Sequence, residues 1–350
     1  MSSAPDHVNV DLETSLPITG SSDGFTLYKR IDKRNPSRNL PIRSRADWFK
    51  HAPPKSPIHI AQGRSAVELI DRWTPNGGSP TIPDELRALM DTHELTTSAT
   101  ISEGFAECTT GLYQPGSPRN HDLLLFGRQQ LGSIVVGIEA KADEPLDLTL
   151  NGKLVSAAKR IQANDATGLP ERIDWLLKCV LQCRLDIDAY RRRVTAGLMG
   201  PPAEWDFSEF FATADKAEPA LARLRYQLFS GLAGTVIESL ALEKAVAVFV
   251  IYEFRTAHTD DTKLESNAAD VQAFCSKIPV LRDTSIEFGK LYGPFTLPII
   301  SGIPKPLPTV PVLIGKIRVD LREGNHTEAQ AHQPAVAPIA AGGLVLTPTP

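Results

Sequence analysis

Residues 245–254, AVAVFVIYEF, restrict the fold more than any other stretch, because only Glu253 among them is charged. A strand with one exposed face alternates apolar and polar residues, whereas a strand covered on both faces is apolar almost throughout. The run is also too short to cross a bilayer, which requires about 20 apolar residues. It therefore predicts a strand inside a sheet that is covered on both faces.

The neighbouring segments supply the other elements. Apolar residues at three- and four-residue spacing predict helices over 83–95, 152–190 with a break at 168–170, 215–244 and 269–278. Ser65 followed by Glu68 resembles a capping box and predicts that a helix begins there and runs to Trp73. Strands are predicted over 96–113 and 310–321, with a hairpin between them at 121–146. Because no glycine fingerprint follows a strand, the order favours a mixed-sheet α/β fold over a Rossmann array.

Composition sets broader limits. Of the 350 residues, 42% are hydrophobic and 22% are charged, as in a globular protein with a substantial core. The net charge of −4 gives no support to nucleic-acid binding over the whole surface, although a local basic groove remains compatible with it. The best candidate is 29–45, which has seven Lys or Arg and one Asp; it is either a solvated arm or a strip that contacts phosphates.

The chain ends and the cysteines are less informative. Residues 1–24 are polar and aperiodic and 323–350 are rich in Ala, Pro and Gly, so both are expected to be disordered around a domain at 25–322. The first residues lack the pattern of a secretory signal, and the four cysteines are too scattered for a disulfide scaffold, so a cytoplasmic location is expected. Cys179 and Cys183 lie in an apolar run that favours the core over a CxxxC metal site.

The hairpin ends in charged residues that need partners. If its strands fold about a turn near Gln130, opposed residue numbers sum to about 260, and Asp122 faces Ile138 or Glu139. Strand alternation places Glu139 and Lys141 on one face. Two carboxylates about 4.5–5.5 Å apart at Cβ repel unless a cation lies between them.

Two interpretations of these charges remain open. In the first, Mg²⁺ binds both carboxylates, Lys141 positions a water nucleophile or stabilises the transition state, and the metal-free chain carries uncompensated repulsion. In the second, Lys141 pairs with Glu139 or Asp122 at a solvated sheet edge, and the residues have no catalytic role.

Asp122, a strand-length gap and Glu139-x-Lys141 together resemble the PD-(D/E)xK nuclease superfamily. The wider chain resembles an uncharacterised bacterial family, known as a domain of unknown function and grouped with those nucleases, over roughly residues 40–320. The matching segments are ADW (46–48), GRSAVELIDRW (63–73), the Glu107 strand, RNHDLLLFGR (119–128), VGIEAKADEP (136–145), GLPERIDWLL (168–177) and LRYQLFSGLAGTVIES (224–239). Two departures are NHD where the family has QND, and a helical insertion near 186–218.

The resemblance implies a restriction-endonuclease-like α/β fold, with a mixed β-sheet core flanked by helices. It implies a nuclease that uses Mg²⁺ or Mn²⁺ to hydrolyse phosphodiester bonds in nucleic acid, with Asp122 and Glu139 as metal ligands and Lys141 as a catalytic residue. Glu107 matches an acidic family position and is a third candidate ligand, although a symmetric loop would place it opposite residue 125. The alternative is a nuclease-fold binding or regulatory module that no longer cuts.

Other candidate residues follow from the same resemblance. Some superfamily members place a Gln or Tyr of a helix against the site, which makes Gln227 a candidate catalytic residue beside Arg225 and Tyr226. Because these three differ in helical phase, at most two can point inward.

Glu68 could act as a helix carboxylate, but the capping box explains it better. His121 is interpreted as a hydrogen-bonded loop histidine rather than a base. No membrane partner is expected, and the oligomeric state stays open.

Overall fold

The computed structural model describes residues 24–54, 60–114, 116–130, 132–197, 200–242, 244–299 and 308–322. The two predicted disordered ends, 1–24 and 323–350, lie outside the described residues except for Gly24. No helix within these ranges is long and apolar enough to cross a membrane.

Within the described chain, one mixed sheet of eight strands has the order β2-β1-β3-β4-β5-β8-β10-β9. β3, β4 and β5 form an antiparallel meander, whereas β5, β8 and β10 run parallel to one another. The strands are β1 (Thr26–Lys29), β2 (Leu40–Ile42), β3 (Thr100–Thr110), β4 (Arg119–Gln129), β5 (Gly132–Lys141), β8 (Val246–Arg255), β9 (Lys290–Phe295) and β10 (Val312–Asp320). The predicted decapeptide strand is therefore β8, and it lies inside the sheet with both faces covered.

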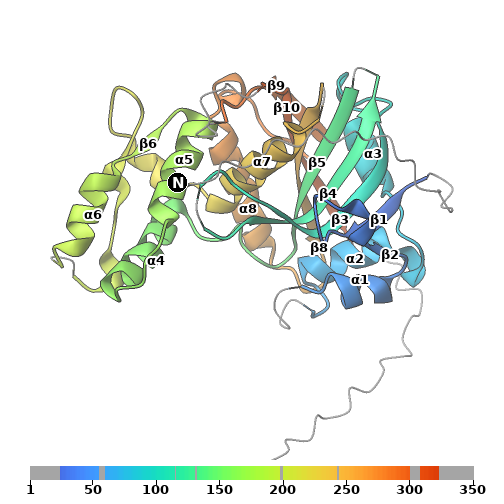
Figure 1. Cartoon of the computed structure of the whole chain (residues 1–350), viewed down its shortest axis with the longest axis horizontal. Helices are drawn as coiled ribbons and strands as arrows, with labels where there is room; N and C mark the ends of the chain where they lie inside the picture. The colour runs from blue at the N-terminus through green and yellow to red at the C-terminus, as the bar shows by residue number, and fades with distance from the viewer. Residues whose placement is uncertain are drawn as a thin grey trace, which may run out of the picture.

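Helices cover the two faces unequally (Figure 1). The short helices α1 (Arg45–His51), α2 (Ser65–Trp73) and α3 (Asp84–Met90) pack on one face. The other face carries α7 (Tyr226–Ser239) and α8 (Asp261–Cys275). Beyond α7 lies a group formed by α4 (Leu150–Gln162), α5 (Leu169–Leu181) and α6 (Ile187–Thr195), with the small β6 (Arg184–Leu185) and β7 (Phe211–Ala212) pair. This mixed α/β architecture confirms the expected class, a mixed sheet flanked by helices as in restriction-endonuclease-like folds.

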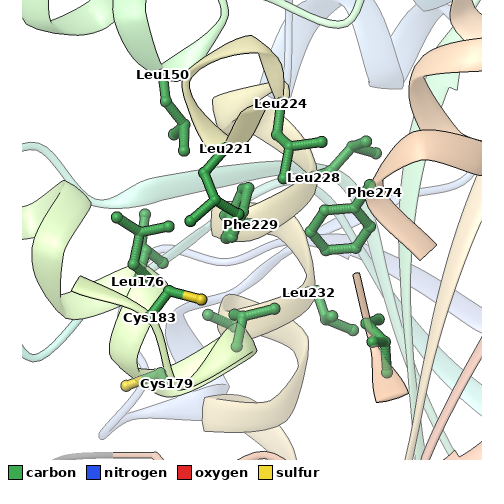
Figure 2. Close-up of a cluster of buried hydrophobic side chains, with 14 of the residues drawn as sticks. Leu150, Leu176, Cys179, Cys183, Leu221, Leu224, Leu228, Phe229, Leu232 and Phe274 are labelled. Atoms are coloured by element: carbon green, nitrogen blue, oxygen red, sulfur yellow. The ribbon is translucent and has the colours of Figure 1, made fainter. Parts of the chain in front are cut away.

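The larger hydrophobic core lies between the sheet and the helices of the α7 side. Figure 2 shows part of it, where side chains of α5, α7 and α8 meet, including Leu176, Phe229 and Phe274. The rings of Phe229 and Phe274 meet edge to face with centroids 5.0 Å apart. Cys179 and Cys183 are buried in this core, which confirms that they are packing residues.

Three local expectations need correction. Residues 215–225 do not extend α7, because the chain there forms a short 3-10 helix at Pro219–Arg223 and α7 begins at Tyr226. The basic segment 29–45 is largely exposed, as expected, but it is not a detached arm: it contains the end of β1, all of β2 and the start of α1, and Arg30 and Lys33 pair with the buried Glu238 of α7 at 3.2 and 3.1 Å. Its contact with phosphates stays a prediction. Helix α2 begins at Ser65 as predicted, but Arg64 is its N-cap residue and Glu68 accepts instead from the amide of Gly63 at 2.8 Å.

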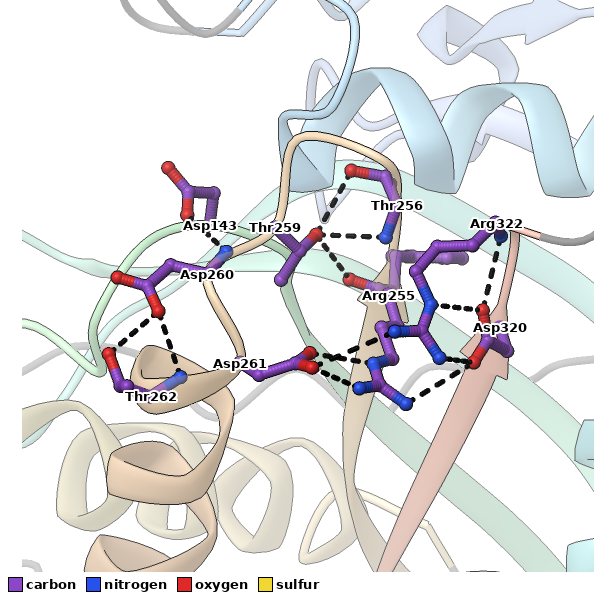
Figure 3. A network of polar contacts seen from close by, with 10 residues as sticks. Asp143, Arg255, Thr256, Thr259, Asp260, Asp261, Thr262, Asp320 and Arg322 are labelled. Carbon is purple, nitrogen blue, oxygen red and sulfur yellow. Dashed lines mark hydrogen bonds and ion pairs between the residues drawn. The ribbon is translucent and has the colours of Figure 1, made fainter.

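A polar network joins the carboxyl ends of β8 and β10 to the start of α8 (Figure 3). The guanidinium of Arg255 pairs with Asp261 and, at 3.5 Å, with Asp320, which also binds Arg322. The backbone amide of Asp260 donates to Asp143, two residues after Lys141, at 3.1 Å. The network therefore fixes the loop before α8 against the end of β5.

Candidate functional site

The register of the β4–β5 hairpin brings Asp122 next to Glu139. Leu123 pairs with Ile138, and residue numbers sum to 261 along the ladder, so one further step places Asp122 opposite Glu139. Gly137 of β5 lies directly beneath Thr235 of α7. Because side chains alternate along a strand, Glu139 and Lys141 also point to the α7 side.

Glu139 is 1% exposed and bound by three donors. Its Oε1 accepts from Lys141 Nζ at 2.8 Å and from the side-chain amide of Gln227, and its Oε2 pairs with Arg119. Burial alone would raise the pKa of Glu139, but the charges of Lys141 and Arg119 hold it below its ordinary value. The expectation of uncompensated repulsion in the metal-free chain is therefore wrong for Glu139, because the buried Lys141 and the largely covered Arg119 both pair with it.

Asp122 has a different environment. Its Oδ2 accepts from the backbone amide of Ala140 at 2.7 Å. Burial and then the negative charge of Glu139 raise the pKa of Asp122 well above its ordinary value, against the opposing effect of Lys141. The two carboxyls consequently differ, since Glu139 keeps its charge and Asp122 resists ionisation.

Lys141 keeps its charge in the same cluster. Burial would lower the pKa of its ammonium, but Glu139 and then Asp122 raise it above its ordinary value. The pair of Lys141 and Glu139 exists, as the structural interpretation requires, but it is buried in an interior strand and not at a solvated sheet edge.

The outer end of β4 departs from regular alternation. Leu124 shares the α7 face with Gly137, its partner in the ladder, so strict alternation would turn Arg119 and His121 to the opposite face. Instead, Arg119 reaches Glu139, and His121 packs against α7 at Gly234. On the adjacent β3, Glu107 has a left-handed φ of 46°. These departures bring Arg119 into the cluster.

Glu107 lies nearer to Asp122 than the sequence suggested. Ala106 pairs with Leu123 and Cys108 with His121, so Glu107 is level with Asp122 and not with residue 125. Its carboxylate accepts from the side-chain amide of Asn120 at 2.5 Å, and its charge contributes to the raised pKa of Asp122. In the described part of the chain, no three His, Cys, Asp or Glu side chains form a group that could hold a metal ion. Glu107 is therefore a neighbour of the pair and completes no three-ligand cluster.

The three candidate residues at the start of α7 point in different directions, as their positions around the helix require. Gln227 contacts Glu139, Tyr226 lines a neighbouring cavity, and Arg225 turns away to pair with Asp270 at 2.7 Å.

His121 is not a hydrogen-bonded loop residue. It lies in β4, it is fully buried, and neither ring nitrogen has a partner in the described chain. Burial lowers its pKa well below the ordinary value, so His121 is neutral.

A cavity of about 550 Å³ opens beside the cluster. Arg119 and Gln227 belong to both, because each lines the cavity and donates to Glu139. Most of the remaining wall comes from the loop before β4, from α4 and from the start of α5. Its charged side chains are Arg119, Lys153, Arg160, Arg172 and Asp147, so positive charge predominates.

Sequence reasoning missed Arg119, Asn120 and Arg172. Arg119 and Asn120 stand within the quoted RNHD motif, but regular alternation gave Arg119 the opposite face to Asp122. Arg172 lies in the GLPERIDWLL segment on a helix whose distance from the hairpin only the fold reveals. The one sequence signal that could have identified it is an arginine on the apolar face of a predicted helix, a position where a charged side chain is rarely buried without a partner.

A family model described as Domain of unknown function (DUF6946) matches residues 41–191 and 207–318. The two matched ranges cover most of the chain, and the gap between them falls within the predicted insertion at 186–218. No curated protein and no solved structure matches the chain. The chain therefore belongs to this family, the Domain of unknown function DUF6946.

Proposed function

We propose that the chain is a metal-dependent phosphodiesterase of the PD-(D/E)xK type that hydrolyses nucleic acid. The observation that carries the proposal is the set of two adjacent carboxyls, Asp122 and Glu139, with the buried ammonium of Lys141 on the same face. The pKa of Asp122 is raised partly by the charge of Glu139, and a cation between the two would relieve this cost.

The donor set suits Mg²⁺ or Mn²⁺. Asp122 and Glu139 supply carboxylate oxygens, and Oε1 of Gln227 is buried without a hydrogen-bond partner in the described chain. Hard divalent cations prefer such oxygen ligands, usually one or two carboxylates completed by water and substrate phosphate. Asp122 and Glu139 would therefore hold the ion, with Gln227 beside them. When bound, the ion would polarise the phosphodiester and lower the pKa of a water molecule.

Lys141 and Arg119 have roles that depend on charge. The ammonium of Lys141 is held by Glu139 and keeps its proton, so it serves as a fixed positive charge and not as a base. Such a charge stabilises the extra negative charge that develops on the phosphate oxygens during hydrolysis, and it costs no reorganisation at that moment. Arg119, which links Glu139 to the cavity, is placed to orient the substrate phosphate.

The alternative, a nuclease-fold binding module without catalysis, has one observation in its favour. Arg119, Lys141 and Gln227 already satisfy Glu139 as hydrogen-bond donors. A structural role explains that arrangement without any metal ion.

Cleavage assays test the proposal. The purified chain should cut DNA or RNA with Mg²⁺ or Mn²⁺ and lose this activity in EDTA. Asp122→Asn and Lys141→Met should each lower the rate by about a hundredfold or more, because the first removes a charged metal ligand and the second removes the positive charge that stabilises the transition state. Asp283→Asn, which changes an exposed carboxylate outside the cavity lining, is the matched control and should keep full activity. Metal-independent cleavage, or an unaffected Asp122→Asn variant, would refute the hydrolase.

Metal binding can be measured separately from cleavage. A cation that binds the native state should stabilise it by RT ln(1 + [L]/Kd), about 1.4 kcal/mol at ten times Kd. Thermal unfolding in a Mg²⁺ series should show this increase for the natural chain and for Asp283→Asn, but not for Asp122→Asn. Equal increases in all three chains would place the ion elsewhere.

A further inference from the structure

The cavity beside the cluster contains a buried arginine without a counter-charge. Arg172 of α5 is 6% exposed. Its guanidinium donates to the backbone carbonyls of Ser117 and, at 3.2 Å, Gln114, and it forms no ion pair within the described chain. Its Nε is buried without a hydrogen-bond partner there. The two carbonyls satisfy part of the guanidinium, but no carboxylate of the described chain neutralises its charge, which an anionic ligand would do.

The loop before β4 is shaped around this side chain. Gly116 has a left-handed φ of 127°, and a Cβ at this position would lie 2.8 Å from Cζ of Arg172. Only glycine therefore lets the loop backbone approach the guanidinium so closely. The loop carbonyls hold Arg172 at the cavity wall, and a side chain held in this way loses little entropy when a ligand binds.

Two further cations besides Arg119 line the wall, and each already pairs with a carboxylate. Lys153 pairs with Asp147 at 2.7 Å, and Arg160 pairs with Asp165 at 2.7 Å near the rim. Gly168 and Leu169 bring the amino end of α5 to the cavity, where the helix dipole adds positive potential. The cavity volume of about 550 Å³ lies within the usual range for small-ligand sites.

We propose that this cavity binds a phosphate group of a nucleic-acid strand, with Arg172 as its main contact. This phosphate would be a neighbour, along the same strand, of the phosphodiester that is cut at Asp122 and Glu139. The choice of a nucleic-acid strand rests on the proposed function. Arg119 lines the cavity and also contacts Glu139, so a strand that enters the cavity continues directly to the candidate catalytic cluster. A guanidinium suits this role because its planar fork of donors matches phosphate oxygens.

The test is binding of a fluorescein-labelled thymidine oligonucleotide in EDTA, followed by fluorescence anisotropy across a series of salt concentrations. Arg172→Gln should weaken binding about tenfold or more, the equivalent of one lost charged contact. The dependence of log affinity on log salt should also become shallower by about 0.7, the value for one phosphate contact with a single strand. Arg282→Gln removes an exposed arginine outside the cavity lining and should change neither quantity.

A second variant guards against loss of folding at Arg172. The double substitution Lys153→Gln and Arg160→Gln removes two cations nearer the rim and should weaken binding in the same direction. The inference is overturned if a folded Arg172→Gln chain binds the oligonucleotide with unchanged affinity. If Arg172→Gln does not fold, unchanged affinity of the double variant overturns it instead. Competition by thymidine monophosphate as strong as that by the oligonucleotide would also overturn it, because the cavity would then be a mononucleotide site.

Hydrolysis of bis(p-nitrophenyl) phosphate with Mg²⁺ separates this inference from the proposed function. This small diester has no neighbouring phosphate, so its hydrolysis by the natural chain reports on the Asp122 and Glu139 cluster, whereas oligonucleotide affinity reports on the cavity. If the natural chain binds the oligonucleotide through Arg172 but hydrolyses no diester, the cavity inference stands and the hydrolase is refuted. If the chain hydrolyses the diester and Arg172→Gln binds the oligonucleotide normally, the cavity inference alone is overturned.

Discussion

Glu139 is the residue on which the charge balance of the candidate site depends. Its carboxylate is the shared ion-pair partner of Lys141 and Arg119, whose side chains are 7% and 10% exposed. Buried ion pairs contribute little net stability compared with apolar replacements, but removing one partner leaves the other charge unneutralised. The same three side chains therefore matter for folding and for any chemistry.

The first prediction concerns Glu139→Gln without metal. The substitution keeps the shape of the side chain and leaves two buried cations without a counter-charge, so the free energy of unfolding should fall by about 3 kcal/mol. Chemical unfolding in EDTA measures this change, with the exposed Asp283→Asn as a control that should unfold like the natural chain. A Glu139→Gln chain as stable as the natural one would mean that the two cations do not depend on Glu139.

The second prediction concerns the pH dependence contributed by Asp122. Its pKa is raised in the folded state, so the native chain binds this proton more tightly than the unfolded chain does. The contribution to stability is fully present below the unfolded pKa, near 3.8, and is lost as pH rises through the folded value. Asp122→Asn removes this loss, so its stability relative to the natural chain should increase from pH 4 upward.

Urea unfolding of both chains across this pH range in EDTA provides the measurement. Saturating Mg²⁺ should reduce the difference between them, because a cation favours the ionised form of Asp122. A stability difference that stays constant with pH would show that Asp122 ionises alike in the folded and unfolded chains.

At the scale of elements, the site depends on how closely α7 packs against β5. Gly137 has no side chain, and a Cβ there would overlap Oγ1 of Thr235. This close approach places the first turn of α7 over the end of β5, where Gln227 reaches Glu139. The helix therefore supplies both a packing surface and a contact of the site.

The third prediction is that Gly137→Ala displaces α7. The added methyl group should cost about 1–3 kcal/mol as overpacking, and it should weaken any Mg²⁺ stabilisation because Gln227 moves with the helix. Gly111→Ala is the matched control, since a Cβ at that position meets no atom within 4 Å. Equal stability of the two variants in thermal unfolding would contradict the close packing of α7 on β5.

At the scale of the whole molecule, one sheet separates two hydrophobic cores. Trp48 and Trp73 lie in the core under α1–α3, whereas Trp175 and Trp205 lie in the core on the α7 side. The central strand β8 contributes side chains to both cores, whereas β5 contributes to the core under α1–α3 and, through Val135, to a small third cluster with Phe105 and Leu124. Both cores pack against the same sheet. If one core unfolded, one face of the sheet would be exposed and the strands on which the other core packs would lose support, so the two cores should unfold together.

The fourth prediction follows from this shared sheet. Leu89→Ala opens a cavity in the core under α3 and should cost about 2–5 kcal/mol. Far-UV circular dichroism and tryptophan fluorescence should report one coincident transition, shifted equally by the substitution. Two separate transitions, of which only one responds to Leu89→Ala, would show that the cores are independent units.

The sequence by itself determined the local parts of this molecule. The apolar run 245–254 specified an interior strand, and the position of the short turn limited the residue opposite Asp122 to Ile138 or Glu139, of which the structure has Glu139. Gln227 was a candidate through resemblance, and helical phase limited how many of its neighbours could join it. These features depend on residues close in the chain, for which spacing and alternation are sufficient.

The tertiary structure alone decided how the charges are paired. Arg119 joins Glu139 because β4 departs from alternation at its outer end, which regular periodicity cannot predict. The side chains that complete the cavity come from α4, α5 and α7, so their convergence depends on how helices pack against the sheet. Long-range packing also left Arg172 buried without a carboxylate partner, because burial and charge pairing are properties of the folded surface and not of neighbours in the sequence.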